Sequence, residues 1–137
     1  MKEFKFVYGE EEFILSEENF TYIENEEVED FTIENVLDIL NEGKEVVDFD
    51  YEYYSDKCEE CDGGKTLDKK HYGFLEYHFY IFTKNAKYIT SNISEEFENT
   101  SYSKLRRENK IDDSYIVSVI VCGECKTFNV EVEQCDM

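Results

Sequence analysis

Two pairs of cysteines constrain this chain more than any other feature. Cys58 and Cys61 form one C-x-x-C pair, Cys122 and Cys125 form a second, and 60 residues separate the two pairs. Four thiolates are the ligands of many tetrahedral zinc sites, and a two-residue gap lets one tight turn present two of them. We therefore expect Cys58, Cys61, Cys122 and Cys125 to bind one metal ion.

The segments around each pair have the patterns of β-strands. The expected strands are residues 46–54 and 71–83 around the first pair, and residues 114–121 and 127–133 around the second. Glycines accompany both pairs and supply the backbone freedom that a tight turn needs: Gly63, Gly64 and Gly123. Each pair is therefore expected at or near the tip of a β-hairpin.

Two hairpins whose tips share one metal ion resemble a zinc ribbon. The resemblance implies a structural zinc ion held by four thiolates. The chain departs from the usual ribbon, because residues 84–113 would be an insertion, the knuckles lack proline and no glycine follows Cys125. A rubredoxin-like iron or redox site uses the same four thiolates and is the alternative. Thioredoxin-type redox catalysis is disfavoured, because a glycine turn and a strand follow Cys61 instead of a helix.

Three lysines lie directly beside the cysteine pairs: Lys57, Lys65 and Lys126. A zinc ion with four thiolates carries a net negative charge, so nearby ammonium groups would help to keep the thiols deprotonated. The alternative is that these lysines are ordinary surface residues.

The remaining cysteine and the two histidines do not have the spacing of ligands. Cys135 lies ten residues after Cys125 along an expected strand. At about 3.3 Å per residue, that distance is about 33 Å, so Cys135 is expected to be a bystander, a free thiol or an oligomer contact and not a ligand. His71 and His78 belong to the expected strand 71–83 and are expected to be sheet residues.

The best helix signal covers residues 33–42. Its apolar residues recur at positions i, i+3, i+4 and i+7: Ile33, Val36, Leu37 and Leu40. Thr32 can cap the start, and Gly43 stands where a left-handed residue commonly ends a helix. We expect this helix to cover one face of a sheet.

The other elements complete an α+β fold. We expect an opening hairpin of residues 4–8 and 13–15, short strands at 21–23 and 87–90, and a weak helix within 94–110. Residues 74–82 are nearly all large and apolar, as in a central strand that is covered on both faces. The result is a mainly antiparallel sheet with one or two helices and a zinc-ribbon-like pair of β-hairpins. A length of 137 residues fits a single domain, 1–137.

Residues 47–53 alternate strictly between two kinds of side chain. Odd positions are apolar or aromatic and even positions are acidic: Val47, Phe49, Tyr51 and Tyr53 against Asp48, Asp50 and Glu52. A period of two indicates a strand with one aromatic face and one carboxylate face. A row of carboxylates of this kind could bind a basic protein or mimic a nucleic-acid backbone, although a merely solvated face is the simpler interpretation.

The net charge of −20 is concentrated at the start of the chain. Residues 1–56 contain 19 acidic residues and three lysines, net −16, and residues 57–137 contain 15 acidic and 11 basic residues, net −4. Binding to nucleic acid needs clustered Lys and Arg, so it is not expected. A basic protein is the partner that this charge favours.

Several classes of function lack support in the sequence. No stretch has the roughly 20 apolar residues that cross a membrane, and the first residues do not form a secretory signal, so we expect a cytoplasmic protein without membrane contact. Five cysteines in such a reducing compartment favour metal binding or free thiols over disulfides. No set of residues forms a catalytic constellation, so an enzyme is not expected.

The whole chain resembles an uncharacterised family of small acidic clostridial proteins. The residues that carry this resemblance are the acidic opening Gly9-Glu10-Glu11-Glu12 and the two cysteine pairs. The resemblance implies no activity. The sequence thus predicts a small acidic protein with a structural four-cysteine zinc site that serves as a protein-interaction module.

Overall fold

The computed structural model describes residues 2–54, 72–94, 97, 100–123 and 126–135. The elements in these residues are, in order, β1 (Glu3–Tyr8), β2 (Glu11–Ser16), β3 (Phe20–Glu24), α1 (Ile33–Glu42), β4 (Asp50–Tyr54), β5 (Tyr72–Lys84), β6 (Lys87–Ser91), α2 (Tyr102–Arg107), β7 (Asp113–Cys122) and β8 (Phe128–Gln134). The α+β class expected from the sequence is confirmed.

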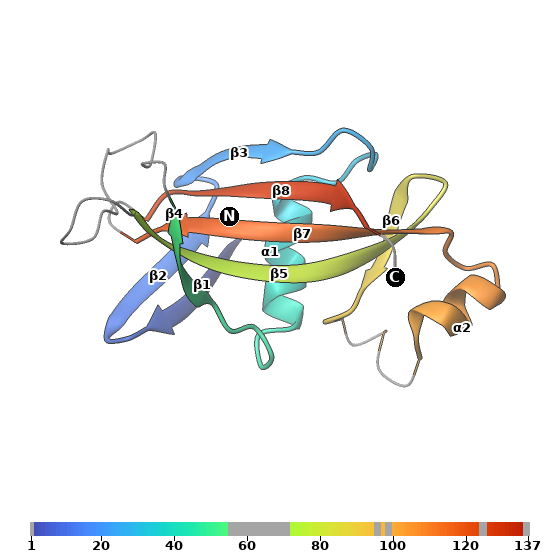
Figure 1. Cartoon of the computed structure of the whole chain (residues 1–137), viewed down its shortest axis with the longest axis horizontal. Coiled ribbons are helices and arrows are strands. Elements are labelled where there is room, and N and C mark those ends of the chain that lie inside the picture. Colours follow the sequence, from blue (N-terminus) through green and yellow to red (C-terminus); the bar gives the residue numbers. More distant parts are fainter. Residues whose placement is uncertain (1, 55–71, 95–96, 98–99, 124–125, 136–137) are drawn as a thin grey trace.

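A six-stranded sheet forms the centre of the fold. Its strand order is β3-β8-β7-β5-β4, and β6 also pairs with β5. The β3–β8 pair is parallel and the other pairs are antiparallel. In Figure 1, β8, β7 and β5 pass in front of α1, so the helix covers the rear face of the sheet and the opposite face is turned toward the viewer.

The hydrophobic core lies between α1 and the rear face of the sheet. The helical spacing of Val36, Leu37 and Leu40 puts these three residues on one stripe, and all are fully buried. Phe79 of β5 and Val117 of β7 face them from the sheet and pair across the two strands. Burying one side chain of this size contributes roughly 1.5–3 kcal/mol, so this layer is a major source of stability.

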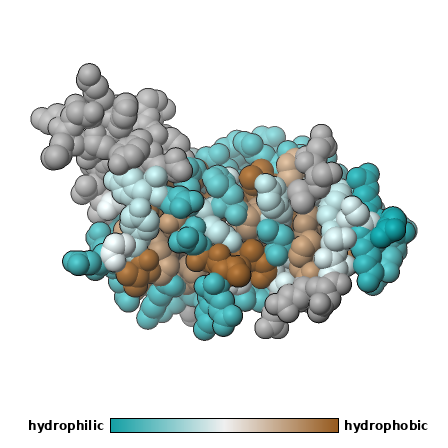
Figure 2. All heavy atoms as spheres, turned by 60° about the horizontal axis from the view of Figure 1, so that its bottom comes forward, coloured by the Kyte–Doolittle hydropathy of each residue, from teal (hydrophilic) through white to brown (hydrophobic). Residues whose placement is uncertain are grey.

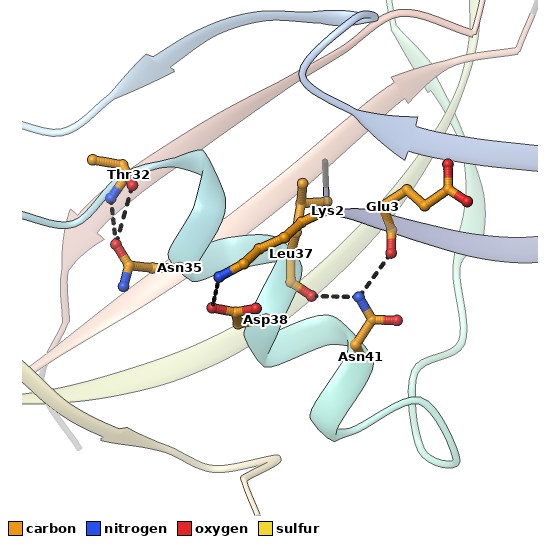
Figure 3. Close-up of polar contacts among 7 residues, drawn as sticks. All are labelled: Lys2, Glu3, Thr32, Asn35, Leu37, Asp38 and Asn41. Carbon is orange, nitrogen blue, oxygen red and sulfur yellow. Dashed lines mark hydrogen bonds and ion pairs between the residues drawn. The ribbon is translucent and has the colours of Figure 1, made fainter.

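The structure confirms the predicted start of α1 but not the predicted conformation at its end. At the start, Asn35 Oδ1 accepts hydrogen bonds from the Thr32 backbone N–H at 2.8 Å and from Thr32 Oγ1 at 3.2 Å (Figure 3). At the end, Gly43 has a φ of −98°, so the expectation of a left-handed residue is wrong. A Cβ on Gly43 would lie 2.8 Å from the Cβ of Ile93. Close approach of Ile93 is the reason that glycine fits here.

The strands β1 and β2 form a separate antiparallel hairpin beside α1, as the sequence predicts. Lys2 Nζ lies 2.7 Å from Asp38 Oδ2 of the helix (Figure 3). Asn41 Nδ2 donates hydrogen bonds to the Glu3 carbonyl oxygen at 2.8 Å and to the Leu37 carbonyl oxygen at 2.9 Å (Figure 3). These contacts hold the hairpin on the helix.

Two predicted elements are shorter in the structure. The strand expected at 46–54 begins only at Asp50, so Val47 and Phe49 precede it. The register still confirms alternation within β4, because Asp50 pairs with Glu76 and Tyr51 pairs with Leu75, which lie on opposite faces of the sheet. The helix expected within 94–110 is limited to α2 (Tyr102–Arg107).

The central strand β5 is covered on both faces only near its ends. Phe74 and Phe82 are buried on the face opposite α1, but His78 between them is exposed. The expectation that both faces of residues 74–82 are covered is therefore wrong in the middle of the strand. No described element packs across that region, so polar residues can occupy it.

One face of the molecule has a patch of apolar residues. When the lower edge of Figure 1 is turned toward the viewer, apolar residues gather in the middle of a mostly hydrophilic face (Figure 2). Val46 and Ile89 are among the exposed apolar residues of the molecule. A cavity of about 390 Å³ is lined by residues 41–46 and Ile93.

None of the described helices is long and apolar enough to cross a membrane.

Candidate metal-binding site

The expected cysteine ligands lie in the connections at one end of the sheet or, for Cys122, at the strand end beside one of them. Cys122 is the last residue of β7 and is buried. Cys58 and Cys61 fall in the connection between β4 and β5, and Cys125 falls in the connection between β7 and β8, so these three lie outside the described residues. Within the described residues, no group of three or more His, Cys, Asp or Glu side chains is placed to hold a metal ion.

The strands that lead into both connections lie side by side. β4 and β5 pair up to Tyr54 and Tyr72, so the connection with the first cysteine pair starts and ends at adjacent positions. β5 and β7 pair with Phe74 opposite Cys122. Neighbouring strands are about 4.8 Å apart, so the two connections leave the same end of the sheet within about 10 Å of each other. The strand pairs expected on either side of the cysteine pairs are confirmed.

Two glycines and a tyrosine form the base of this end of the sheet. The Gly123 N–H donates a hydrogen bond to the Gly73 carbonyl oxygen at 3.3 Å. A Cβ on Gly73 would collide with the ring of Tyr51, and that ring also stacks on Tyr8 with 6.0 Å between the ring centroids. Because the Tyr51 ring fills the space of a side chain at position 73, glycine there lets the strands and the ring approach closely.

The β7–β8 connection has a tight turn. The Cys122 N–H donates to the Thr127 carbonyl oxygen at 2.9 Å, and the Lys126 N–H donates to the Cys122 carbonyl oxygen at 3.1 Å. Lys126 has a φ of 64°, in the left-handed region that glycine adopts most easily. The sequence lacks a glycine after Cys125, yet the backbone at position 126 has the conformation that a glycine would supply.

The side chain of Lys126 binds the N-terminal hairpin. Its Nζ donates to the Glu12 carbonyl oxygen at 2.9 Å and lies 3.2 Å from Glu11 Oε1. The same ammonium group lies 5.0 Å from the centroid of the Phe13 ring. Lys126 therefore ties the β7–β8 connection to β2, a role that the sequence interpretation missed. Lys57 and Lys65 lie outside the described residues.

Asn19 makes a second link between the same segments. Its Nδ2 donates to the carbonyl oxygens of Ile14 and Lys126, each at 2.7 Å, and its Oδ1 accepts from the Ser16 N–H at 2.9 Å. Asn19, the residue before β3, thus connects the end of β2 to the β7–β8 turn. No local signal could have identified Asn19, because the parallel pairing of β3 with β8 brings it to Lys126.

Cys135 lies at the other end of the sheet. The Cys135 N–H donates to the Ser114 carbonyl oxygen at 3.1 Å, and Ser114 stands at the start of β7, eight residues before Cys122. Eight strand residues span about 26 Å, so Cys135 is remote from Cys122. His78 lies within β5, as expected for a sheet residue, and His71 lies outside the described residues.

Comparison with known proteins gives a family but no described activity. No curated protein and no solved structure is significantly similar to this chain. The model of a family described as "Protein of unknown function (DUF3785)" matches residues 4–137. An uncharacterised family, as the sequence led us to expect, is therefore confirmed. Because the match covers nearly the whole length, the chain belongs to the DUF3785 family of proteins of unknown function.

Proposed function

We propose that the protein is an interaction module without enzymatic activity, in which one structural zinc ion joins two hairpin tips. The ligands are Cys58, Cys61, Cys122 and Cys125. One observation carries this proposal. The pairing of β5 with β7 brings the bases of both C-x-x-C segments to the same end of the sheet, although 60 residues separate the segments in the sequence.

The local geometry at Cys122 supports a structural role. The turn after Cys122 is closed by two backbone hydrogen bonds and is linked to β2 by Lys126 and Asn19. Preorganised ligands lose less conformational freedom when a metal binds. Four thiolates fill the coordination shell of a tetrahedral zinc ion, so a site of this kind has no open position for a substrate.

The acidic surface indicates the class of partner. A net charge of −20 attracts basic proteins and repels nucleic acids and anionic lipids. We therefore propose a basic protein as the partner, with the zinc ion stabilising the sheet that presents the acidic residues.

Metal analysis tests the zinc site directly. Protein that is purified without added metal is expected to be colourless and to contain one zinc ion per chain. A red protein that contains iron would instead identify a rubredoxin-like site with the same ligands.

Cysteine variants separate a structural ion from an adventitious one. Cys58→Ser and Cys122→Ser should each lose the zinc ion and lower Tm, because metal binding at such a site contributes to folding. Cys135→Ser, at the remote end of β7, is the matched control and should keep both the metal and the Tm. Wild-type protein without metal, or full zinc content in both ligand variants, would refute the proposal.

A further inference from the structure

The sheet has one covered face and one open face. α1 packs on the covered face, and no described element crosses the middle of the other, which is turned toward the viewer in Figure 1. Near one end, the Phe82 ring stacks on Phe97 with 5.1 Å between ring centroids and lies tilted against Tyr102 with 5.3 Å between ring centroids. We call the region between this aromatic group and Cys122 the open face. Among the described side chains, its charged residues are Glu24, Asp50, Glu76, His78, Glu131 and Glu133.

Cross-strand register brings several of these residues into one row. His78 pairs with Ser118, Ser118 pairs with Glu131, and Glu131 pairs with Glu24. His78 Nδ1 lies 2.8 Å from Ser118 Oγ, and His78 Nε2 lies 3.8 Å from Glu76 Oε1. The row therefore contains one imidazole on β5 and two carboxylates, Glu131 on β8 and Glu24 on β3, and Glu76 lies beside the imidazole on β5.

The open face has more negative charge than its own residues balance. Five carboxylates share it with one histidine among the described side chains. Burial raises the pKa of Glu131, and the nearby Glu24, Glu133 and Glu76 raise that pKa further, whereas His78 lowers it. Carboxylates that repel one another in this way are stabilised by a cation that approaches them.

Apolar side chains lie between the carboxylates. Ile116 pairs with Glu133 and Ile120 pairs with Glu76, and both isoleucines are half-buried. Lysine and arginine have a long aliphatic stem and a charged head, so they can cover isoleucine with the stem and pair with a carboxylate through the head. This mixed surface therefore suits basic side chains better than a small inorganic cation.

The same charges disfavour other occupants. Phosphate groups of nucleic acids or anionic lipids would face five carboxylates. A second copy of the chain has a net charge of −20, so approach of two copies would bring like charges together. A basic protein segment is the occupant that the charge of this face complements.

We propose that the open face is a docking surface for a partner segment rich in lysine and arginine. The inference rests on the proposed interaction function and identifies where the partner binds, and it is independent of the metal.

A synthetic peptide of alternating lysine and valine residues is a suitable probe, and fluorescence anisotropy measures its binding. Wild-type protein should bind it at 50 mM salt and bind roughly tenfold more weakly at 500 mM, because salt screens exposed charges. A Glu76→Gln, Glu131→Gln, Glu133→Gln triple variant should weaken binding at 50 mM salt by roughly tenfold or more.

A charge-matched control distinguishes the open face from net charge. Glu10→Gln, Glu34→Gln, Glu45→Gln removes three exposed carboxylates from the β1–β2 turn, from α1 and from the segment after α1. This variant should bind the peptide as wild type does. Equal weakening by both triple variants, or weakening by the control alone, would overturn the open face as the site while leaving the interaction function in place.

Two further outcomes act against the inference. Failure of wild-type protein to bind the peptide at 50 mM salt would refute both the open face and the proposed interaction with basic proteins, whatever the zinc content. A wild-type dimer in light scattering that the Glu76→Gln, Glu131→Gln, Glu133→Gln variant converts to a monomer would show that a second copy occupies this face.

Discussion

Replacing Asn19 is the sharpest test of the contacts that fix the β7–β8 turn. Asn19→Ala removes two donated hydrogen bonds, to the carbonyl oxygens of Ile14 and Lys126, and one accepted from the Ser16 N–H. Each such bond contributes about 0.5–1.5 kcal/mol net, so the loss should be about 3 kcal/mol. For a chain of this size, that loss lowers Tm by roughly 10 °C.

An isosteric variant separates hydrogen bonding from shape. Asn19→Asp keeps the acceptor for Ser16 but places a second carboxylate oxygen where Nδ2 lies 2.7 Å from each of two carbonyl oxygens. Above the usual pKa range of a carboxyl group, Asn19→Asp should therefore be less stable than Asn19→Ala. The difference should shrink as pH falls and the carboxyl group gains a proton that it can donate.

Urea denaturation and thermal melts measure these effects, with Asn35→Ala as the control. Asn35 makes exposed hydrogen bonds to Thr32 at the start of α1, so its truncation should cost about 1 kcal/mol or less. The reasoning is refuted if Asn19→Ala is as stable as Asn35→Ala, or if Asn19→Asp equals wild type at pH 7. The Lys126 N–H donates a hydrogen bond to the Cys122 carbonyl oxygen, so faster hydrogen exchange of this N–H in Asn19→Ala would locate the loss at the turn.

Three other substitutions test separate parts of the fold. Gly43→Ala should lower the free energy of unfolding by about 1–3 kcal/mol in urea melts, because the new Cβ would collide with Ile93 and the φ of −98° means that alanine relieves no backbone strain. An unchanged free energy of unfolding would contradict that contact. Glu131→Gln should raise Tm at pH 7, because the pKa of Glu131 is raised in the folded protein and its ionisation therefore destabilises the fold as pH rises. The gain in Tm should vanish at about pH 2–3, where carboxyl groups are protonated in both states. An equal gain in Tm at that pH would contradict the reasoning. Phe82→Ala should cost about 3–5 kcal/mol and speed hydrogen exchange in α2, because Phe82 is fully buried under the rings of that region.

Features that depend on neighbours in the chain could be predicted from the sequence. The helix 33–42 was found with its bounds, because its apolar residues recur with the helical period and Thr32 precedes them. The β1–β2 hairpin was found from an alternating segment 4–8, a turn signal at Gly9 and the apolar residues 13–15, and Gly9 has a φ of 66° in the structure. The strands around both cysteine pairs were also found from local patterns, although the first of them begins at Asp50 and not at residue 46.

Errors arose where distant residues decide the outcome. The expectation for Gly43 failed because Ile93, fifty residues later, determines the need for glycine there. The polar residues of β5 in the middle of the open face were missed, because the period of a strand does not show whether another element covers it. His78 is exposed because none of the described elements packs over that face.

The sequence by itself determined the local elements, the acidic charge and the spacing of the two C-x-x-C pairs. Only the tertiary structure decided that β5 pairs with β7 and β3 pairs with β8. Those pairings bring both cysteine connections to one end, place Asn19 against Lys126 and gather carboxylates from four strands on the open face. The physical reason is that closing a long loop costs little more than closing a short one, so strand order follows from which faces can be buried together and not from distance along the chain.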